Sequence, residues 1–161
     1  MMLSRFLLVC VLGLAVPLAG CTTASTNSLS TAKAALVEPE IRVGKPSDMD
    51  GLIQKYAVLY DMPESLLRRV IVRESRYNPK ARNGPYWGLM QIRHDTATVM
   101  GYKGSASGLL DAETNLRYAG KYLRGAYLVA DRNPDRAMRL YASGYYYDAK
   151  RKGLLKEVGL R

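Results

Sequence analysis

The stretch Leu66–Ile92 reads LLRRVIVRESRYNPKARNGPYWGLMQI and joins a predicted helix to a turn and a second apolar segment. At about 100° per residue, the apolar residues from Leu66 to Ile71 share one helix face, and Glu74 falls near the centre of that face. A carboxylate directed at a protein core costs free energy unless it is paired, hydrogen-bonded or protonated. Glu74 is therefore the first candidate for chemistry in the chain.

The residues around this stretch predict further helices. An apolar stripe that starts at Met49 predicts a helix as far as Tyr60, and Pro63 suits the first position of the helix that carries Glu74. After that helix we expect a loop over 77–86, followed by a strand or helix over 87–92 and a short helix over 95–100. A flexible loop over 103–108 then leads to a long helix over 111–131. The last predicted helix runs from Pro134 to Gly144 and is capped by Asn133. The predicted fold class is all-α, with at most a small β-hairpin near Trp87.

The N-terminus predicts an exported lipoprotein. An apolar run over residues 6–16 is too short to span a bilayer and suits the hydrophobic part of a signal peptide. It leads into Leu18-Ala19-Gly20-Cys21, which resembles a bacterial lipobox, where the signal is cut before the cysteine and the cysteine receives lipid. A plain secretory signal, with Cys21 incidental, is the alternative.

These features divide the chain into three parts. We expect a signal peptide over 1–20, a flexible tether rich in Ser, Thr and Ala over 21–46, and one globular domain over 47–161. Lipid on Cys21 would anchor the domain to a membrane. Thr22, directly after that cysteine, resembles the sorting signal for the outer membrane, so the expected location is the periplasm.

The charge balance indicates a polyanionic partner. The chain has 24 Lys and Arg against 14 Asp and Glu, a formal net charge of +10. Such an excess suits nucleic acid or an acidic cell-wall polymer. Export argues against nucleic acid, whereas peptidoglycan carries carboxylates on its peptide stems. A solvated basic surface without a specific partner is the alternative.

A single carboxylic acid in an apolar setting keeps its proton near neutral pH and can donate it to a leaving oxygen. This is half of the chemistry of glycoside cleavage, and ordinary glycosidases need a second carboxylate. Asp95, Asp111 and Glu113 are the candidates. Each precedes or opens a predicted helix, where acids are common for capping and dipole reasons, so none is convincing.

Other kinds of site find little support in the sequence. His94 is the only histidine, which excludes a His-based metal cluster, and no glycine pattern for binding phosphate occurs. We therefore expect no metal and no cofactor. The run Tyr145–Tyr147 is suited either to stacking on sugar rings or to filling the core and its rim.

Several short motifs occur in a fixed order from Glu74 onwards. They are Glu74-Ser75, Asn78-Pro79, Gly88-Leu89-Met90-Gln91-Ile92, Thr96-Ala97, Asn115-Leu116, Gly120, Tyr122-Leu123 and Tyr141-Ala142-Ser143-Gly144. In order and spacing they resemble the signature of the Slt-type lytic transglycosylases, relatives of the goose-type lysozymes. The resemblance extends from about Ser47 to Gly144.

The resemblance implies a lysozyme-like helical fold with a cleft that binds the glycan strands of peptidoglycan. It implies that Glu74 acts as acid and then as base while O6 of the muramic sugar closes a 1,6-anhydro ring, so that no second carboxylate is needed. It further implies that Ser75 orients Glu74 or the substrate, that Met90 and Gln91 line the cleft, and that Tyr141 hydrogen-bonds near the glutamate.

The sequence departs from the family pattern at Ala142, where the family commonly has Asn, and at His94, where it commonly has Pro. There are two alternatives to a lytic transglycosylase. One is a goose-type hydrolase that produces free reducing ends. The other, suggested by the loss of an amide at Ala142, is a catalytically silent lipoprotein that binds peptidoglycan.

Overall fold

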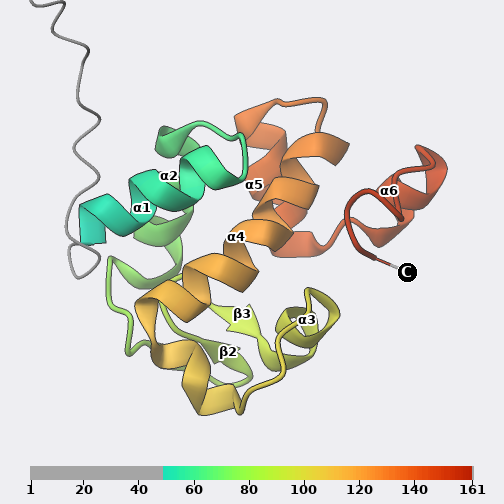
Figure 1. Ribbon diagram of the computed structural model, residues 1–161. Coiled ribbons are helices and arrows are strands. Elements are labelled where there is room, and N and C mark those ends of the chain that lie inside the picture. Colours follow the sequence, from blue (N-terminus) through green and yellow to red (C-terminus); the bar gives the residue numbers. More distant parts are fainter. Residues whose placement is uncertain (1–48, 161) are drawn as a thin grey trace, which may run out of the picture. The chain divides into compact units, whose positions relative to one another are not determined.

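The computed structural model of the protein describes residues 49–160. In this part of the chain, helices pack with one small antiparallel sheet (Figure 1). The elements are α1 (Met49–Leu59), α2 (Glu64–Ser75), β1 (Arg82–Asn83), β2 (Tyr86–Trp87), β3 (Ile92–Arg93), α3 (His94–Val99), the 3-10 helix η1 (Ala106–Leu110), α4 (Ala112–Val129), α5 (Pro134–Ser143) and α6 (Tyr146–Arg151). The predicted all-α fold with a small β element is confirmed. The predicted signal peptide, tether and Cys21 lie outside the described residues.

Helix α4 passes through the middle of the domain and contacts α1, α3, α5 and η1 (Figure 1). Its N-cap is Asp111, whose carboxylate accepts a hydrogen bond of 2.8 Å from the Thr114 N–H. Helix α5 begins at Pro134 after its cap Asn133, as the sequence predicts. Short polar side chains at the first turns therefore set where the two longest helices of the second half begin.

Helix α2 presents its apolar face to the core, where Leu66, Leu67, Val70 and Ile71 are fully buried. The helix ends in two consecutive residues with left-handed backbone, Arg76 with φ 52° and Tyr77 with φ 64°. Few residues other than glycine adopt this conformation, and it turns the chain sharply. The turn sends the chain from the end of α2 into the sheet.

The sheet has the order β1-β2-β3, with both pairs antiparallel. At most a hairpin was expected near Trp87, and the structure adds the third strand, β3. Each strand has only two residues, which is too short for an alternating pattern to appear in the sequence.

Two further elements differ from the prediction. The segment expected as a flexible loop over 103–108 overlaps η1, where Leu109 is buried. The run after Gly144 forms α6, anchored by Tyr145 and Ala149, which are 1% and 0% exposed. Helices of five or six residues are too short to show a periodicity, so packing rather than pattern determines them.

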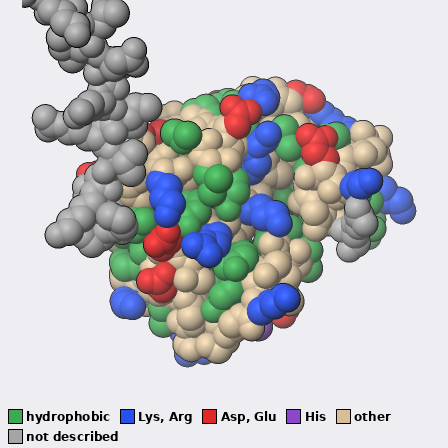
Figure 2. Space-filling view, viewed as in Figure 1, with side chains coloured by type: hydrophobic (Ala, Val, Ile, Leu, Met, Phe, Trp, Pro, Cys, Tyr) green, Lys and Arg blue, Asp and Glu red, His purple; other side chains and the backbone are tan. Residues whose placement is uncertain are grey.

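Lysine and arginine side chains are scattered among acidic and hydrophobic ones on the face seen in Figure 2, and do not gather into one patch there. Many lysine and arginine side chains of the described residues are paired, such as Arg69 with Asp135 at 2.6 Å and Arg132 with Asp61 at 2.8 Å. In the part of the chain with coordinates, no helix is long and apolar enough to cross a membrane.

Candidate active site

Glu74 lies in the last turn of α2, at the mouth of a cavity of about 370 Å³. This Glu74 cavity is lined by Arg73, Glu74, Asn83, Tyr86, Gln91, Tyr141 and Ala142. The Glu74 side chain is 23% exposed, whereas the apolar residues of the same helix face are fully buried. The sequence pattern predicts that Glu74 points into the core. In the structure it lines the cavity instead, because α2 ends at this point and its last turn extends beyond the core.

Arg73 pairs with Glu74 inside this cavity. Its Nη2 and Nε atoms lie 2.5 and 2.9 Å from the same carboxylate oxygen, Oε1. A third nitrogen, Nη1, donates to the Met138 carbonyl at 3.4 Å. The guanidinium therefore joins the end of α2 to α5 and holds the Glu74 carboxylate by charge-assisted hydrogen bonds.

Tyr141 comes from α5 and lines the same cavity. Its hydroxyl donates a hydrogen bond of 2.8 Å to the carbonyl of Met90. Burial, reinforced by the negative charge of Glu74, raises the pKa of Tyr141 well above its usual value. Tyr141 therefore stays a neutral donor. It lies near the glutamate as expected, but its partner is the backbone of the segment that follows β2.

The structure gives Ser75 and Met90 contacts that differ from the roles implied by the resemblance. The Ser75 hydroxyl donates to the carbonyl of Leu89 at 2.7 Å, and also contacts the carbonyl of Ile71 at 3.3 Å. The Met90 side chain is fully buried in the core, so it does not line the cavity. A short polar side chain at a helix end is closer to backbone carbonyls than to a ligand, and an unbranched thioether fills a core well. Both residues hold the segment 88–92 against α2.

Gln91 does line the cavity, and its backbone is left-handed with φ 48°. Its side-chain Nε2 donates to the carbonyls of Gly88 at 2.8 Å and Ala81 at 3.1 Å. These two bonds hold a conformation that residues other than glycine rarely adopt. The Gln91 side chain, which lines the cavity, is thereby fixed in position.

Asn115 organises the site from the core, a role that the sequence analysis did not assign. It is fully buried in α4. Its Oδ1 accepts from the Met90 N–H at 2.9 Å, and its Nδ2 donates to the carbonyls of Trp87 and Leu109 at 2.8 Å each. The signal available in the sequence was an amide within the apolar stripe of the long helix.

Gly88 allows Asn115 to approach this closely. Its φ is +71°, and a Cβ atom there would lie 2.1 Å from the Leu109 carbonyl oxygen and 2.4 Å from Asn115 Nδ2. Only glycine fits both the backbone conformation and the contact. Gly88 is therefore required by the packing between β2 and the N-terminal end of α4.

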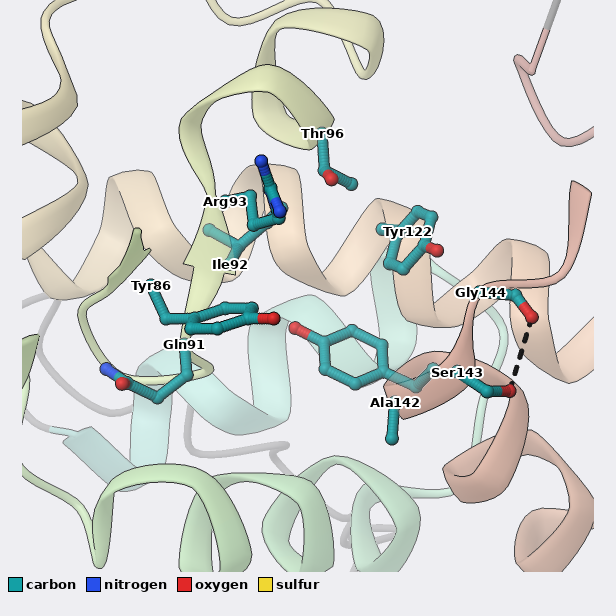
Figure 3. A pocket seen from close by; sticks show the side chains of 10 residues that line it. Tyr86, Gln91, Ile92, Arg93, Thr96, Tyr122, Ala142, Ser143 and Gly144 are labelled. Atoms are coloured by element: carbon teal, nitrogen blue, oxygen red, sulfur yellow. Dashed lines mark hydrogen bonds between the residues drawn. The ribbon is translucent and has the colours of Figure 1, made fainter. Parts of the chain in front are cut away.

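A second cavity of about 260 Å³ continues the first, and we call it the middle cavity. The two share the lining residues Tyr86, Gln91, Tyr141 and Ala142. Figure 3 shows Tyr86 and Gln91 on the sheet side of the middle cavity and Ala142, Ser143 and Gly144 on the opposite side, at the end of α5. The two cavities therefore form one groove, which we call the Glu74 groove.

The departure at Ala142 faces this groove directly. Its methyl group lines both cavities, where the family commonly has an amide. The neighbouring Ser143 hydroxyl donates to the carbonyl of Arg139 at 3.0 Å and contacts that of Gly144 at 3.3 Å (Figure 3). The Ser143 hydroxyl is thus hydrogen-bonded to backbone carbonyls at the end of its own helix. With alanine at position 142, the groove is wider and less polar at this point than it would be with asparagine.

None of the other candidate carboxylates lines the Glu74 groove. Asp95 pairs with Arg93 at 3.4 Å and Glu113 with Lys55 at 2.6 Å. Asp111 caps α4, and the Thr114 backbone N–H lowers the pKa of this carboxyl below its usual value. Among the residues that line the groove, all within the described range, Glu74 is the only carboxylate.

His94 lies outside the groove lining, with Nε2 2.9 Å from the Gly104 carbonyl and its ring edge-on to Tyr102. Between residues 49 and 160, no group of three or more His, Cys, Asp and Glu side chains is arranged to hold a metal ion. The groove thus offers one acid, two paired cations (Arg73 and Arg93) and several neutral hydrogen-bonding groups.

Comparison with known proteins adds two findings. Residues 51–157 match the model of the family described as "Transglycosylase SLT domain". The "Peptidoglycan transglycosylase gp16" of Escherichia phage T7 is 39% identical over 85 residues, which cover 50% of this chain and 6% of that protein. The chain thus corresponds to a small part of this curated relative. The solved structures gave no significant match.

Proposed function

Because this chain belongs to the transglycosylase SLT domain family, we propose that it is a lytic transglycosylase of peptidoglycan. It cleaves the β-1,4 bond between N-acetylmuramic acid and N-acetylglucosamine and forms 1,6-anhydromuramic acid. The observation that carries this proposal is the single carboxylate, Glu74, in a groove whose other described lining residues supply no second one. Hydrolysis by the usual glycosidase routes would need a second carboxylate in addition to Glu74.

Glu74 performs two proton transfers in the proposed reaction. It first donates its proton to the oxygen that bridges the two sugars, and the bond from that oxygen to C1 of the muramic sugar breaks. It then accepts the proton of the O6 hydroxyl of the same sugar, whose oxygen attacks C1 and closes the ring. The substrate supplies its own nucleophile, and Glu74 ends protonated again.

In the first step Glu74 must approach the bridging oxygen of the glycan, whereas in the structure its Oε1 is occupied by Arg73. We propose that a glycan entering the Glu74 cavity displaces the guanidinium from Oε1. Arg73 is 38% exposed and lines the cavity, so it has room to turn toward the substrate. Tyr86 and Gln91 bind the glycan on the sheet side, while Tyr141 holds the backbone of Met90 in place.

Digestion of purified sacculi followed by mass spectrometry of the released muropeptides tests this function. We expect products that end in 1,6-anhydromuramic acid, and a loss of turnover of a hundredfold or more for Glu74→Gln. Products with free reducing ends and no anhydro ring would establish a goose-type hydrolase instead. A parent protein that binds sacculi without any turnover would establish a silent binding protein.

We also propose that the chain is a lipoprotein held at the outer membrane, facing the periplasm, through lipid on Cys21. The support is the lipobox-like sequence before this cysteine and the residue after it, Thr22. Fractionation of cells that express the parent and Cys21→Ser tests the anchor. The parent is expected in the outer-membrane fraction and the variant in the soluble periplasmic fraction. A parent found in the soluble fraction would disprove the anchor.

A further inference from the structure

A third cavity, of about 230 Å³, continues the Glu74 groove beyond the middle cavity. It shares Thr96, Tyr122 and Gly144 with the middle cavity, and adds Asp95, Val99 and Tyr146 among its lining. In Figure 3 the three shared residues lie away from Gln91, toward the opposite end of the middle cavity. The three cavities therefore follow one another from Glu74 to Tyr146. We call the third one the Tyr146 cavity.

The Tyr146 cavity exposes apolar side chains. Tyr146 on α6 is 46% exposed and Val99 on α3 is 53% exposed. With Tyr86, which is 41% exposed in the groove, they are three of the seven large hydrophobic side chains that the described residues leave exposed. Such side chains usually mark a surface that binds something when they line one depression.

Polar groups at the same place set the kind of ligand. The Asp95 side chain is 82% exposed at the rim, and Thr96 contributes a hydroxyl group to the lining. A pyranose ring has an apolar face, which packs on an aromatic ring, and a rim of hydroxyl groups, which donate to a carboxylate. An exposed tyrosine ring and a carboxylate that line one cavity therefore suit a neutral sugar.

The neighbouring tyrosines have other tasks. Tyr145 is buried and donates to the carbonyl of Tyr122 at 2.8 Å, so it anchors α6 to α4. Tyr147 is 73% exposed and does not line the cavity. Its ring lies edge-to-face against Tyr146, with centroids 5.4 Å apart, and contributes nothing to the cavity lining.

We propose that the Tyr146 cavity is an additional sugar subsite for the glycan strand whose cleaved bond lies at Glu74, an inference that rests on the proposed function. The strand is the occupant because the cavity is continuous with the groove through Thr96, Tyr122 and Gly144. An acidic peptide stem suits it less, since no lysine or arginine lines this cavity, and Arg93, which lines the middle cavity, is paired with Asp95. The subsite makes affinity depend on the length of the strand.

Binding of glycan strands of increasing length to the full chain carrying Glu74→Gln tests this subsite without turnover. The strands are freed of peptide stems by an amidase, and affinity is measured by calorimetry. We expect Tyr146→Ala to weaken the binding of long strands about fivefold and to leave a disaccharide unaffected. Tyr146→Phe keeps the ring and should bind like the parent, as should the matched control Tyr147→Ala.

In the active chain, Tyr146→Ala should raise KM for long strands and leave kcat within about twofold of the parent. Equal affinity of Tyr146→Ala and the parent for every length, or an equal loss for short and long strands, would overturn the subsite. So would an effect seen only with strands that carry stems, because the cavity would then bind peptide. Thermal unfolding of each variant checks that α6 remains folded. The proposed function fails separately, if Glu74→Gln digests sacculi as fast as the parent.

Discussion

The guanidinium of Arg73 and the carboxylate of Glu74, adjacent in sequence, form an ion pair in which two nitrogens approach one oxygen at 2.5 and 2.9 Å. Both side chains line the Glu74 cavity, so the pair is accessible to a ligand. Arg73 occupies Oε1, one of the two oxygens from which Glu74 would transfer a proton in the proposed reaction. Arg73 is therefore expected to restrain the enzyme until substrate is bound.

Replacement of Arg73 by Gln should lower KM for glycan strands, because the substrate then no longer has to displace a guanidinium that is hydrogen-bonded to Glu74. The free energy of unfolding should change by less than about 1 kcal/mol, because the pair is partly exposed. Turnover at increasing concentrations of glycan strands, together with urea unfolding, measures both effects.

The matched control is Arg69→Gln, one turn earlier on α2. Arg69 pairs with Asp135 at 2.6 Å and does not line the groove. The Arg69→Gln substitution removes the same charge from the same helix and leaves the contacts of Glu74 unchanged. An equal change of KM in both variants would assign the effect to net charge and not to the pair.

Replacement of Tyr141 by Phe should lower the free energy of unfolding by about 1–3 kcal/mol, because it leaves the Met90 carbonyl without its donor in a buried place. Turnover should fall as well, since the segment that carries Gln91 loses its attachment to α5. Urea unfolding and sacculus digestion report the two effects. Tyr147→Phe, at an exposed ring, is the control and should leave both unchanged. A Tyr141→Phe variant as stable as the parent would show that this hydrogen bond does not hold the segment.

Replacement of Gly88 by Ala should cost roughly 2 kcal/mol or more in stability. The added Cβ meets the Leu109 carbonyl oxygen at 2.1 Å in addition to the strain of a positive φ. Gly84→Ala is the control, because Gly84 also has positive φ, at +55°, and its Cβ would meet nothing within 4 Å. It should cost about 1 kcal/mol. Equal losses of stability at the two glycines would mean that the close approach of Leu109 and Asn115 to Gly88 adds nothing to the cost of the substitution.

Replacement of Asp111 by Ala should cost about 1 kcal/mol near neutral pH, through loss of the α4 N-cap. The pKa of the Asp111 carboxyl is lowered in the folded protein. Its contribution is therefore complete above the unfolded value of 3.8 and is lost as pH falls through the folded pKa. The stability gap between parent and variant should narrow in acid. Unfolding curves at pH 7 and at pH 3 test this, and a gap that widens in acid would contradict it.

The sequence alone predicts the helices well where they are long or capped. Asp111, Asn133 and Pro134 mark helix starts by local hydrogen bonding and fixed φ, effects that need no tertiary contact. The short elements, β3, η1 and α6, are not predicted, because too few residues form them for a period to appear.

The identity of the candidate acid and the family follow from the sequence by itself. Glu74 stands out because one charge interrupts an apolar helix face, and the order of motifs around it is a property of the chain. The absence of a convincing second carboxylate is likewise visible there, since Asp95, Asp111 and Glu113 lie at predicted helix starts.

Only the tertiary structure decided which residues surround Glu74. Arg73 pairs with it, Met90 turns into the core, and Tyr141 reaches the Met90 carbonyl across 51 positions of sequence. The alignment of the Tyr146 cavity with the groove also depends on how α6 packs against α4. Helix periodicity and caps arise from neighbours along the chain, whereas a groove arises from side chains that only packing brings together.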